Sequence, residues 1–299
     1  MVSHIGTSGP IKPILIMGAP GSGTTLLYQT LCSHRDVAYI TRNMLRTGIV
    51  APRQRLWRYS RFLGERRKAL FILQNLFHRD PASNLPVGDA LWIKYFVDYS
   101  YMTENNYSEE MAAYFRKKIL TVQNLWGRPR FVEKTLLNCF RVRLLNSIFP
   151  DAKFIHIIRD GRAVAFSILN KIEIAGDSNP LFYVGFKDIL GDKYQLERSE
   201  LYNYGLAWAE FVRKAREAST FAQSSRYYEV RYENLITQPY KELRNIVDFC
   251  ELNWYSEFEE KIPPTQNMNE KWKQKASKEQ LVDLEESTFD LRRTLGIAE

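Results

Sequence analysis

Cysteine and long apolar stretches are both scarce in this chain of 299 residues. Its three cysteines are widely spaced and none forms a Cys-x-x-Cys pair, so neither a disulfide framework nor a zinc site is indicated. No stretch reaches the roughly 20 apolar residues of a membrane span, and Met1 to Pro13 lacks the basic start and apolar segment of a secretory signal. We therefore expect a soluble cytoplasmic protein whose residues 1–12 form a loose N-terminus.

The overall composition is that of a globular protein, with 45% hydrophobic and 25% charged residues. These values exclude disorder, a collagen repeat and a coiled coil. A chain of this length buries about three quarters of the surface that its unfolded form exposes, so a large core is available. No linker, repeat or low-complexity segment interrupts the sequence, which predicts one domain over residues 1–299.

Positive charge is concentrated in one segment. The formal net charge is +8, and residues 42–68 alone hold nine basic side chains against a single acid, Glu65, with aromatic residues between them. Such a segment is typical of three surfaces: the solvated face of a packed helix, a contact with a membrane surface or an amphiphilic molecule, and a contact with an acidic polymer. A nucleic-acid partner is not favoured, because no recognisable binding module accompanies the charge.

Short apolar segments alternate with segments of helical composition. Lys12 to Gly18 is typical of a buried strand, and Thr24 to Ser33 of the helix that follows it. Three similar pairs of strand and helix follow: 131–133 with 138–149, 152–158 with 162–170, and 227–231 with 240–250. This alternation predicts a three-layer α/β fold, in which a central, mostly parallel sheet is covered by helices on both faces. Residues 52–77 and 172–198 do not fit the alternation and are predicted to be insertions.

A glycine-rich turn joins the first predicted strand to the first predicted helix. It runs from Gly18 to Thr25 with the sequence Gly-Ala-Pro-Gly-Ser-Gly-Thr-Thr. Glycines in this context let backbone N–H groups approach a phosphate, and the helix dipole favours its charge. The turn fits the frame of a Walker-type phosphate loop, but Thr24 stands where that loop needs a lysine. The pattern predicts an anion site on a P-loop-like fold and argues against a nucleoside triphosphatase.

The segment Pro20 to Thr25 resembles the loop with which PAPS-dependent sulfotransferases hold the 5′-phosphosulfate. Residues 159–167 (RDGRAVAFS) resemble the 3′-phosphate motif of the same family, with Arg159 and Ser167 at the family's spacing. Three further segments resemble family motifs in the same order, including the Glu-Lys-Thr-Pro segment of bacterial and tyrosylprotein-type members: 131–135 (FVEKT), 231–235 (RYENL) and 271–273 (KWK). The resemblance extends from Pro13 to about Lys275.

The resemblance implies transfer of a sulfuryl group from PAPS to the hydroxyl of an acceptor, with 3′,5′-adenosine bisphosphate as the product nucleotide and no metal. Residues 42–101 correspond to the region that usually forms the family's acceptor pocket, so helical insertions are expected to form the acceptor side there. The basic segment would then cover a lipidic or amphiphilic acceptor or make a peripheral membrane contact. The residues expected to bind the nucleotide are Gly21, Ser22, Gly23, Thr24, Thr25, Leu26, Arg159, Ser167, Tyr232 and Lys273.

One position departs from the family pattern in a way that affects catalysis. Gly21 stands where the family normally carries Lys or Arg, whose charge stabilises the bridging oxygen as the sulfuryl group leaves. Transfer of such a group depends mainly on positioning and electrostatic stabilisation, so a missing cation matters. We hypothesise that Lys134 supplies the charge, assisted by the hydroxyls of Thr24 and Thr25.

The general base is not identified by the pattern. Tyrosylprotein-type members carry Glu just after the first helix, and the corresponding stretch here, residues 37–42 (VAYITR), has no carboxylate. His156 lies within a predicted strand, as a core histidine would. The remaining candidates are Glu133, Asp89, Asp98 and His78. A general base must lie within hydrogen-bond reach of the acceptor hydroxyl, and the spacing of residues does not determine which candidate does so. We prefer Glu133 and then Asp89, although each fits a structural role better.

Two other functions stay open for this sequence. The first is an enzyme acting on a nucleotide phosphate with the same fold, which would bind ATP with Mg²⁺. The second is a protein that has the PAPS fold without activity, or that binds a membrane surface, because Gly21 and the missing base both weaken the catalytic interpretation.

Overall fold

The computed structural model describes residues 11–41, 44, 91–92, 94–96, 101–175, 185–222 and 225–297. Most of the predicted acceptor-side insertion, residues 42–101, and all of the helix expected within 52–77 lie outside these residues. Of the predicted loose N-terminus, Ile11 and Lys12 are described, and Lys12 is held by Asp151 and Glu251.

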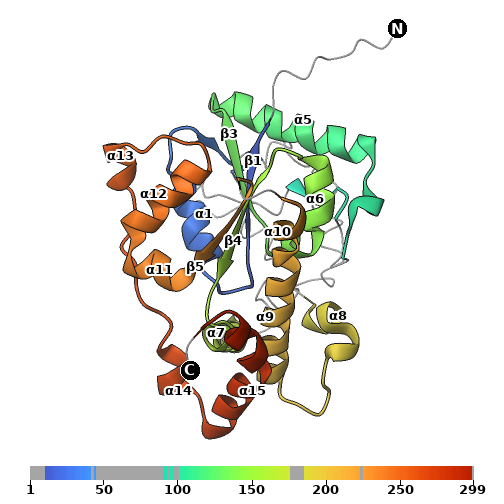
Figure 1. Cartoon of the computed structure of the whole chain (residues 1–299), viewed down its shortest axis with the longest axis vertical. Helices are drawn as coiled ribbons and strands as arrows, with labels where there is room; N and C mark the ends of the chain where they lie inside the picture. The colour runs from blue at the N-terminus through green and yellow to red at the C-terminus, as the bar shows by residue number, and fades with distance from the viewer. Residues whose placement is uncertain are drawn as a thin grey trace.

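Five strands and a larger set of helices make up the described chain (Figure 1). The strands are β1 (Pro13–Met17), β2 (Val37–Ala38), β3 (Arg130–Lys134), β4 (Lys153–Ile158) and β5 (Tyr227–Arg231). The α-helices are α1 (Thr24–Cys32), α5 (Glu109–Trp126), α6 (Val142–Ile148), α7 (Gly161–Ala175), α8 (Phe186–Leu190), α9 (Glu200–Arg216), α10 (Ala218–Phe221), α11 (Tyr232–Thr237), α12 (Pro239–Phe249), α13 (Ser256–Glu259), α14 (Lys271–Lys275) and α15 (Lys278–Thr294). Short 3₁₀ helices are η2 (Glu104–Asn106), η3 (Leu136–Arg141) and η6 (Gly191–Lys193).

The strands form one parallel sheet in the order β2-β3-β1-β4-β5. β1 pairs with β3 on one side and with β4 on the other. The chain therefore adds strands first on one side of β1 and later on the other side, so the strand order reverses at β1. A reversal of this kind opens a crevice at the carboxyl ends of the central strands, where ligands of open α/β sheets bind. The four strand and helix pairs expected from the sequence are all present, and the predicted three-layer α/β fold is confirmed.

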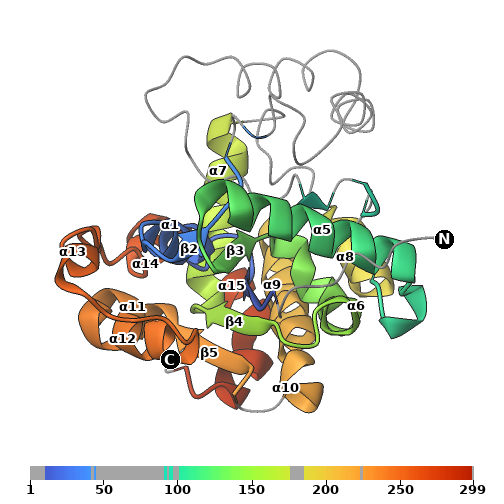
Figure 2. The same ribbon diagram turned by 90° about the horizontal axis from the view of Figure 1, so that it is seen from above.

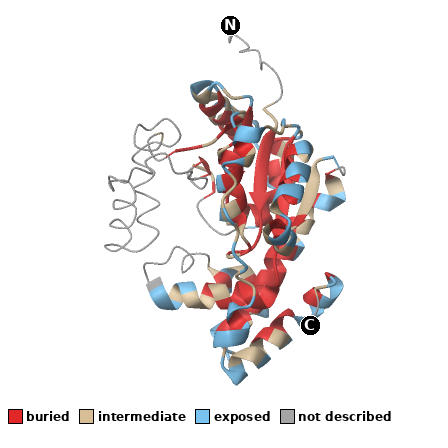
Figure 3. Ribbon diagram, turned by 90° about the vertical axis from the view of Figure 1, so that its left-hand side faces the viewer, coloured by how far each residue is buried: buried red, intermediate tan, exposed pale blue. Residues whose placement is uncertain are grey.

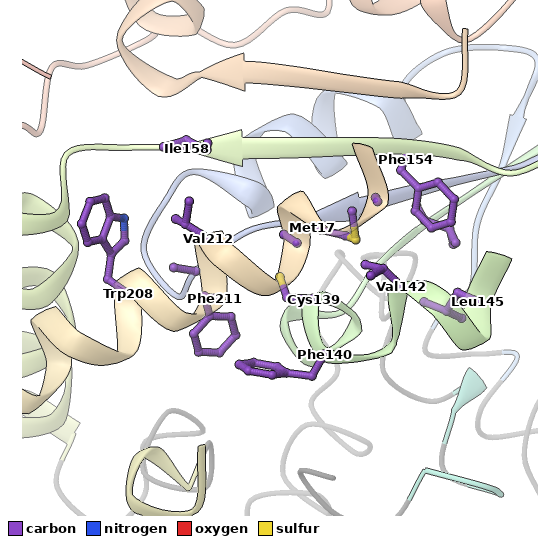
Figure 4. Packing of buried hydrophobic residues seen from close by; sticks show 14 of the residues in the cluster. Met17, Cys139, Phe140, Val142, Leu145, Phe154, Ile158, Trp208, Phe211 and Val212 are labelled. Atoms are coloured by element: carbon purple, nitrogen blue, oxygen red, sulfur yellow. The ribbon is translucent and has the colours of Figure 1, made fainter. Parts of the chain in front are cut away.

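The central strands β1, β3 and β4 are almost entirely buried because helices cover both faces of the sheet, whereas the edge strand β5 is mostly half-buried (Figures 1 and 2). In β1, Ile14 and Ile16 pack with residues of α1, α11 and α12, whereas Leu15 and Met17 face the core formed with α5, α6 and α9. Figure 3 shows the central strands as buried. Figure 4 shows the second of these cores, in which Met17 and Cys139 lie near aromatic side chains of η3 and α9. A short continuous apolar strand is therefore stable here, since both of its faces are removed from water.

The helix ends follow ordinary capping chemistry. Ser108 accepts a hydrogen bond from the Met111 N–H at the start of α5, and Gly127 ends the helix in the left-handed region at φ 61°. The helix predicted over 138–149 differs from the structure, which has η3 followed by α6. The cause is a local side-chain bond, because Asn138 reaches back to Glu133 and tightens the turn after β3.

Helices α7, α14 and α15 gather beyond the carboxyl end of β4 (Figure 1). Within the segment 172–198, which the sequence predicts as an irregular insertion, the described residues form the end of α7, then α8 and η6. Among the helices that the structure describes, none is long and apolar enough to cross a membrane.

His156 gives the fold a defined acid sensitivity. Its ring is fully buried in β4 and lies 2.9 Å from the Tyr227 hydroxyl, and burial lowers the pKa of the imidazole to about 3. The unfolded chain therefore binds a proton at His156 below about pH 6.5 that the folded chain binds only near pH 3, so stability from this group is lost as the pH falls through that window.

We expect His156→Gln to reduce the slope of unfolding free energy against pH by up to about 1.4 kcal/mol per pH unit between pH 6 and 4. Urea denaturation across this range measures the slope, and equal slopes for both proteins would show that the buried ring is protonated.

Gly161, the first residue of α7, is required by the packing of α9. A Cβ atom at this position would lie 2.4 Å from Cε3 of Trp208, whose indole N–H donates to the Arg159 carbonyl. We expect Gly161→Ala to lower the free energy of unfolding by about 1–3 kcal/mol through overpacking. In the background of Trp208→Leu, which removes the contacting ring, the same change should cost less. Additive costs in urea denaturation would contradict this assignment.

Candidate active site

The turn after β1 presents an open helix N-terminus. Gly21 and Gly23 adopt positive φ angles of 86° and 94°, which glycine reaches without steric cost, and they turn the chain sharply into α1. Gly23 occupies the N-cap position and offers no side chain to the first N–H groups of the helix. These amide groups and the positive end of the helix dipole therefore favour an anion at this point.

Ser22 supplies a second polar group in the same turn. Its residue is 1% exposed, and within the described part of the chain its Oγ has no hydrogen-bond partner. A buried hydroxyl without a partner is costly, and an oxyanion bound to the loop would remove that cost. The turn thus fits a phosphate or phosphosulfate group.

Arg159 follows β4 and reaches across to this turn. Its guanidinium donates from Nη1 to the Gly21 carbonyl at 2.8 Å, from Nη2 to the Met268 carbonyl at 2.7 Å and from Nε to Asn269 Oδ1 at 2.7 Å. Since a guanidinium has five N–H groups, one on each terminal nitrogen is left over after these bonds, and that pair matches two oxygens of a phosphate. Burial lowers the pKa of Arg159, although a guanidinium keeps its charge.

Tyr232 and Ser167 pack closely against the turn beside Arg159. The Arg159 guanidinium lies 4.5 Å from the ring centroid of Tyr232, and a Cβ atom at Gly23 would lie 2.7 Å from the same ring. A Cβ atom at Gly21 would lie 3.2 Å from the hydroxyl of Ser167 on α7. The phosphate loop, the start of α11 and the second turn of α7 therefore meet at one place.

These elements surround a cavity of about 450 Å³, a volume in the usual range for a small-molecule site. Eight of the ten residues that the sequence assigned to the nucleotide line it: Gly21, Gly23, Thr24, Thr25, Leu26, Arg159, Ser167 and Tyr232. Ser22 lies within the same turn. The other side of the cavity is formed by α7 and by the segment leading into α14, including Met268 and Trp272.

Lys273, which the sequence also assigned to the nucleotide, is not among the residues that line the cavity. Its ammonium pairs with Glu270 at 2.9 Å on the other side of α14. The cavity is instead lined by Lys271 and Lys275, which share a face because they are four residues apart on a helix. The spacing Lys-x-x-x-Lys around Trp272 is the signal that could have identified them.

The sequence prediction also missed Lys171, which lines the cavity from α7. Desolvation lowers the pKa of its ammonium, and repulsion from Arg159 and Lys134 lowers it further. Its place four residues after Ser167 puts both on one face of α7, a helical spacing that could have revealed it. Four cationic side chains, Arg159, Lys171, Lys271 and Lys275, therefore line the same cavity, which gives it a strong preference for an anionic ligand.

Lys134 and Glu133 leave the end of β3 toward opposite faces of the sheet. The register pairs Lys134 with Ile16, on the face covered by α1, and Glu133 with Leu15, on the other face. The Glu133 carboxylate accepts hydrogen bonds from Thr135 and, at 2.8 Å, from the amide of Asn138. Neither residue lines the cavity itself. The other base candidates from the sequence, Asp89, Asp98 and His78, lie outside the described residues, as does most of the basic segment 42–68.

Arg162 has a structural function in this region. Its guanidinium pairs with Asp160 at 2.8 Å and with Glu285 of α15 at 2.7 Å, and it lies over the ring of Trp272. The pair fastens α7 to α15 and holds one wall of the cavity.

The comparisons with known proteins agree with this geometry. Omega-hydroxy-beta-dihydromenaquinone-9 sulfotransferase Stf3 of Mycobacterium bovis is 32% identical over 143 residues, which are 46% of this chain and 33% of that protein. The aligned region thus spans about a third of the relative's length. Two crystal structures share the fold at 13% identity and a TM-score of 0.58: sulfotransferase STF9 from Mycobacterium avium, with 97% of this chain and 78% of that chain covered, and sulfotransferase STF1 from Mycobacterium tuberculosis, with 94% and 77% covered.

A sequence model of the sulfotransferase family matches residues 13–256. The matched range includes the phosphate loop at Gly21 and the motif that begins at Arg159. Because the match covers most of the chain and both of these elements line one cavity, this protein belongs to the sulfotransferase family.

Proposed function

We propose that the protein transfers a sulfuryl group from PAPS to the hydroxyl of an acceptor. The observation that carries the proposal is the convergence of two anion-binding groups on one cavity: the open N-terminus of α1 and the guanidinium of Arg159 with the Ser167 hydroxyl. PAPS carries anionic groups at both its 5′ and 3′ positions, so a site with two separate anion-binding groups suits it. A lipidic or amphiphilic molecule is our proposed acceptor class.

The residues divide between the two ends of the nucleotide. The loop amides from Gly21 to Leu26, with the hydroxyls of Ser22, Thr24 and Thr25, would hold the 5′-phosphosulfate. Arg159 and Ser167 would hold the 3′-phosphate, and Lys171 adds positive charge beside them. Tyr232 supports the ring side of Arg159 and closes the cavity next to Gly23.

The transfer is an in-line displacement at sulfur. The acceptor oxygen forms a bond to sulfur, the bond from sulfur to the 5′-phosphate oxygen breaks, and 3′,5′-adenosine bisphosphate leaves with the bonding electrons. The negative charge that develops on the bridging oxygen lies at the N-terminus of α1, where the amides, Thr24 and Lys134 would stabilise it.

We assign the acceptor proton to Glu133. Its two hydrogen bonds, from Thr135 and Asn138, fix the orientation of the carboxylate, as the role of a general base requires. Only the proton moves to this residue, so the sulfuryl group is never bonded to the protein.

Binding of the product nucleotide tests the assignment of Arg159. We expect 3′,5′-adenosine bisphosphate at ~100 times its dissociation constant to add about 2.7 kcal/mol to the folded state, which raises the melting temperature by several degrees. Arg159→Ala should abolish most of this shift because the 3′-phosphate loses its charged partner. Differential scanning fluorimetry measures the effect, with 5′-AMP and ATP with Mg²⁺ as comparison ligands.

Lys273→Ala is the matched control, since Lys273 is a nearby lysine outside the cavity, and it should retain the full shift. Stabilisation of the natural protein by ATP with Mg²⁺ alone would contradict the sulfotransferase proposal and favour an enzyme acting on nucleotide phosphates. The absence of a shift with either nucleotide would favour a protein without nucleotide-dependent activity.

Turnover tests the assignment of Lys134. We expect Lys134→Ala to lower kcat by about 10²–10³, as removal of one group that stabilises a developing oxyanion does, with little change in affinity for 3′,5′-adenosine bisphosphate. Lys134→Arg should recover part of the loss. The measurement is release of the bisphosphate from PAPS with a panel of hydroxyl acceptors, and full turnover in Lys134→Ala would remove this residue from the mechanism.

A further inference from the structure

The orientation of Arg159 depends on two side chains that do not belong to the sequence motif containing it. Asn269, which precedes α14, accepts from Arg159 Nε at 2.7 Å. The amide of Asn269 in turn donates from Nδ2 to Glu233 Oε1 at 2.6 Å, and the same oxygen accepts a longer bond of 3.3 Å from the Asp160 N–H. The three residues therefore form a chain from the first turn of α11 to the guanidinium.

The donor and acceptor order of these hydrogen bonds determines which type of side chain can lie at the centre. A guanidinium only donates hydrogen bonds, and a carboxylate only accepts them. An amide between Arg159 and Glu233 satisfies both at once, and it can do so in a single orientation, with its oxygen toward the guanidinium. The orientation of the Asn269 amide is thus determined by both of its hydrogen-bond partners, Arg159 and Glu233.

The hydrogen bond from Nε also determines which N–H groups of the Arg159 guanidinium are left to bind a ligand. With Nε on Asn269 and one N–H of each terminal nitrogen on a backbone carbonyl, the plane of the group is held by three bonds to two segments of the chain, the phosphate loop and the segment before α14. The two remaining N–H groups then have a fixed direction. A bidentate contact with a phosphate is sensitive to such an orientation.

We propose that Asn269, oriented by Glu233, is a positioning residue that gives the site its selectivity for nucleotides with a phosphate at the ribose 3′ position. This proposal rests on the proposed function. Asn269 acts through Arg159 and does not itself contact the nucleotide. Its removal should therefore reduce affinity for a nucleotide with a 3′-phosphate more than affinity for one without.

An exchange of polarity tests the proposal. Asn269→Asp places two carboxylates against each other, which breaks the link to Glu233. The double variant Asn269→Asp with Glu233→Gln restores a donor and an acceptor in the opposite order, keeps the net charge, and sacrifices only the long bond from the Asp160 N–H. The measurement is the ratio of dissociation constants for 5′-AMP and 3′,5′-adenosine bisphosphate, determined by isothermal titration calorimetry.

We expect Asn269→Asp to lower this ratio by about tenfold and the double variant to recover it to within about threefold of the natural protein, because a bidentate phosphate contact is worth a discrimination of this size. Asn267→Asp is the matched control. Its side-chain oxygen accepts from the Asn269 N–H at 2.9 Å, and Asp keeps that acceptor while adding the same charge two residues away. The control should change the ratio by less than about twofold.

An unchanged ratio in Asn269→Asp would overturn the proposal, and so would a ratio that the double variant fails to recover. Equal losses for the two nucleotides would show structural damage and overturn it as well. A natural protein that does not distinguish the two nucleotides would refute the proposed function, which separates that failure from a failure of the Asn269 assignment.

Discussion

Burial of the Arg159 guanidinium is the constraint on which the architecture of the cavity depends. A charged group removed from water must have each of its polar atoms paired, and here the partners come from the phosphate loop, from Met268 and from Asn269. The charge therefore does more than offer a ligand contact. It holds the loop before α1 against the segment before α14, so both walls of the cavity depend on one side chain.

The same contacts give a physical reason for Gly21. The residue has a φ angle of 86°, its carbonyl accepts from Arg159, and a Cβ atom would lie 3.2 Å from Ser167. A lysine at this position would pay about 1–2 kcal/mol for the left-handed backbone and would press on Ser167. The loop therefore gains a close approach to α7 where the family pattern has a cation, and the positive side chains that line the cavity come from Arg159, α7 and α14.

Parallel strands explain why residues distant in sequence can act together. The carboxyl ends of β1, β3 and β4 are neighbours in the sheet, so the loop, Lys134 and Arg159 leave the same edge although the loop precedes the other two by more than a hundred residues. Their side-chain directions differ, because alternation along β3 sends Lys134 toward α1 and Glu133 toward the opposite face. The residues that we propose as cation and base therefore lie on opposite faces of the sheet.

The sequence by itself determined the alternation of strands and helices, the glycine-rich turn between β1 and α1, and the positions of Arg159 and Ser167 after β4, because each depends on local spacing and residue type. Only the tertiary structure decided which lysines reach the cavity: the direction of α14 turns Lys273 toward Glu270 and leaves Lys271 and Lys275 on the inner face. The chain through Asn269 was also beyond the sequence, since nothing in the spacing of residues 159, 233 and 269 indicates that the folded chain brings them together. Local patterns specify elements and loops, whereas hydrogen-bond partners across the sheet are set by how helices pack once the core excludes water.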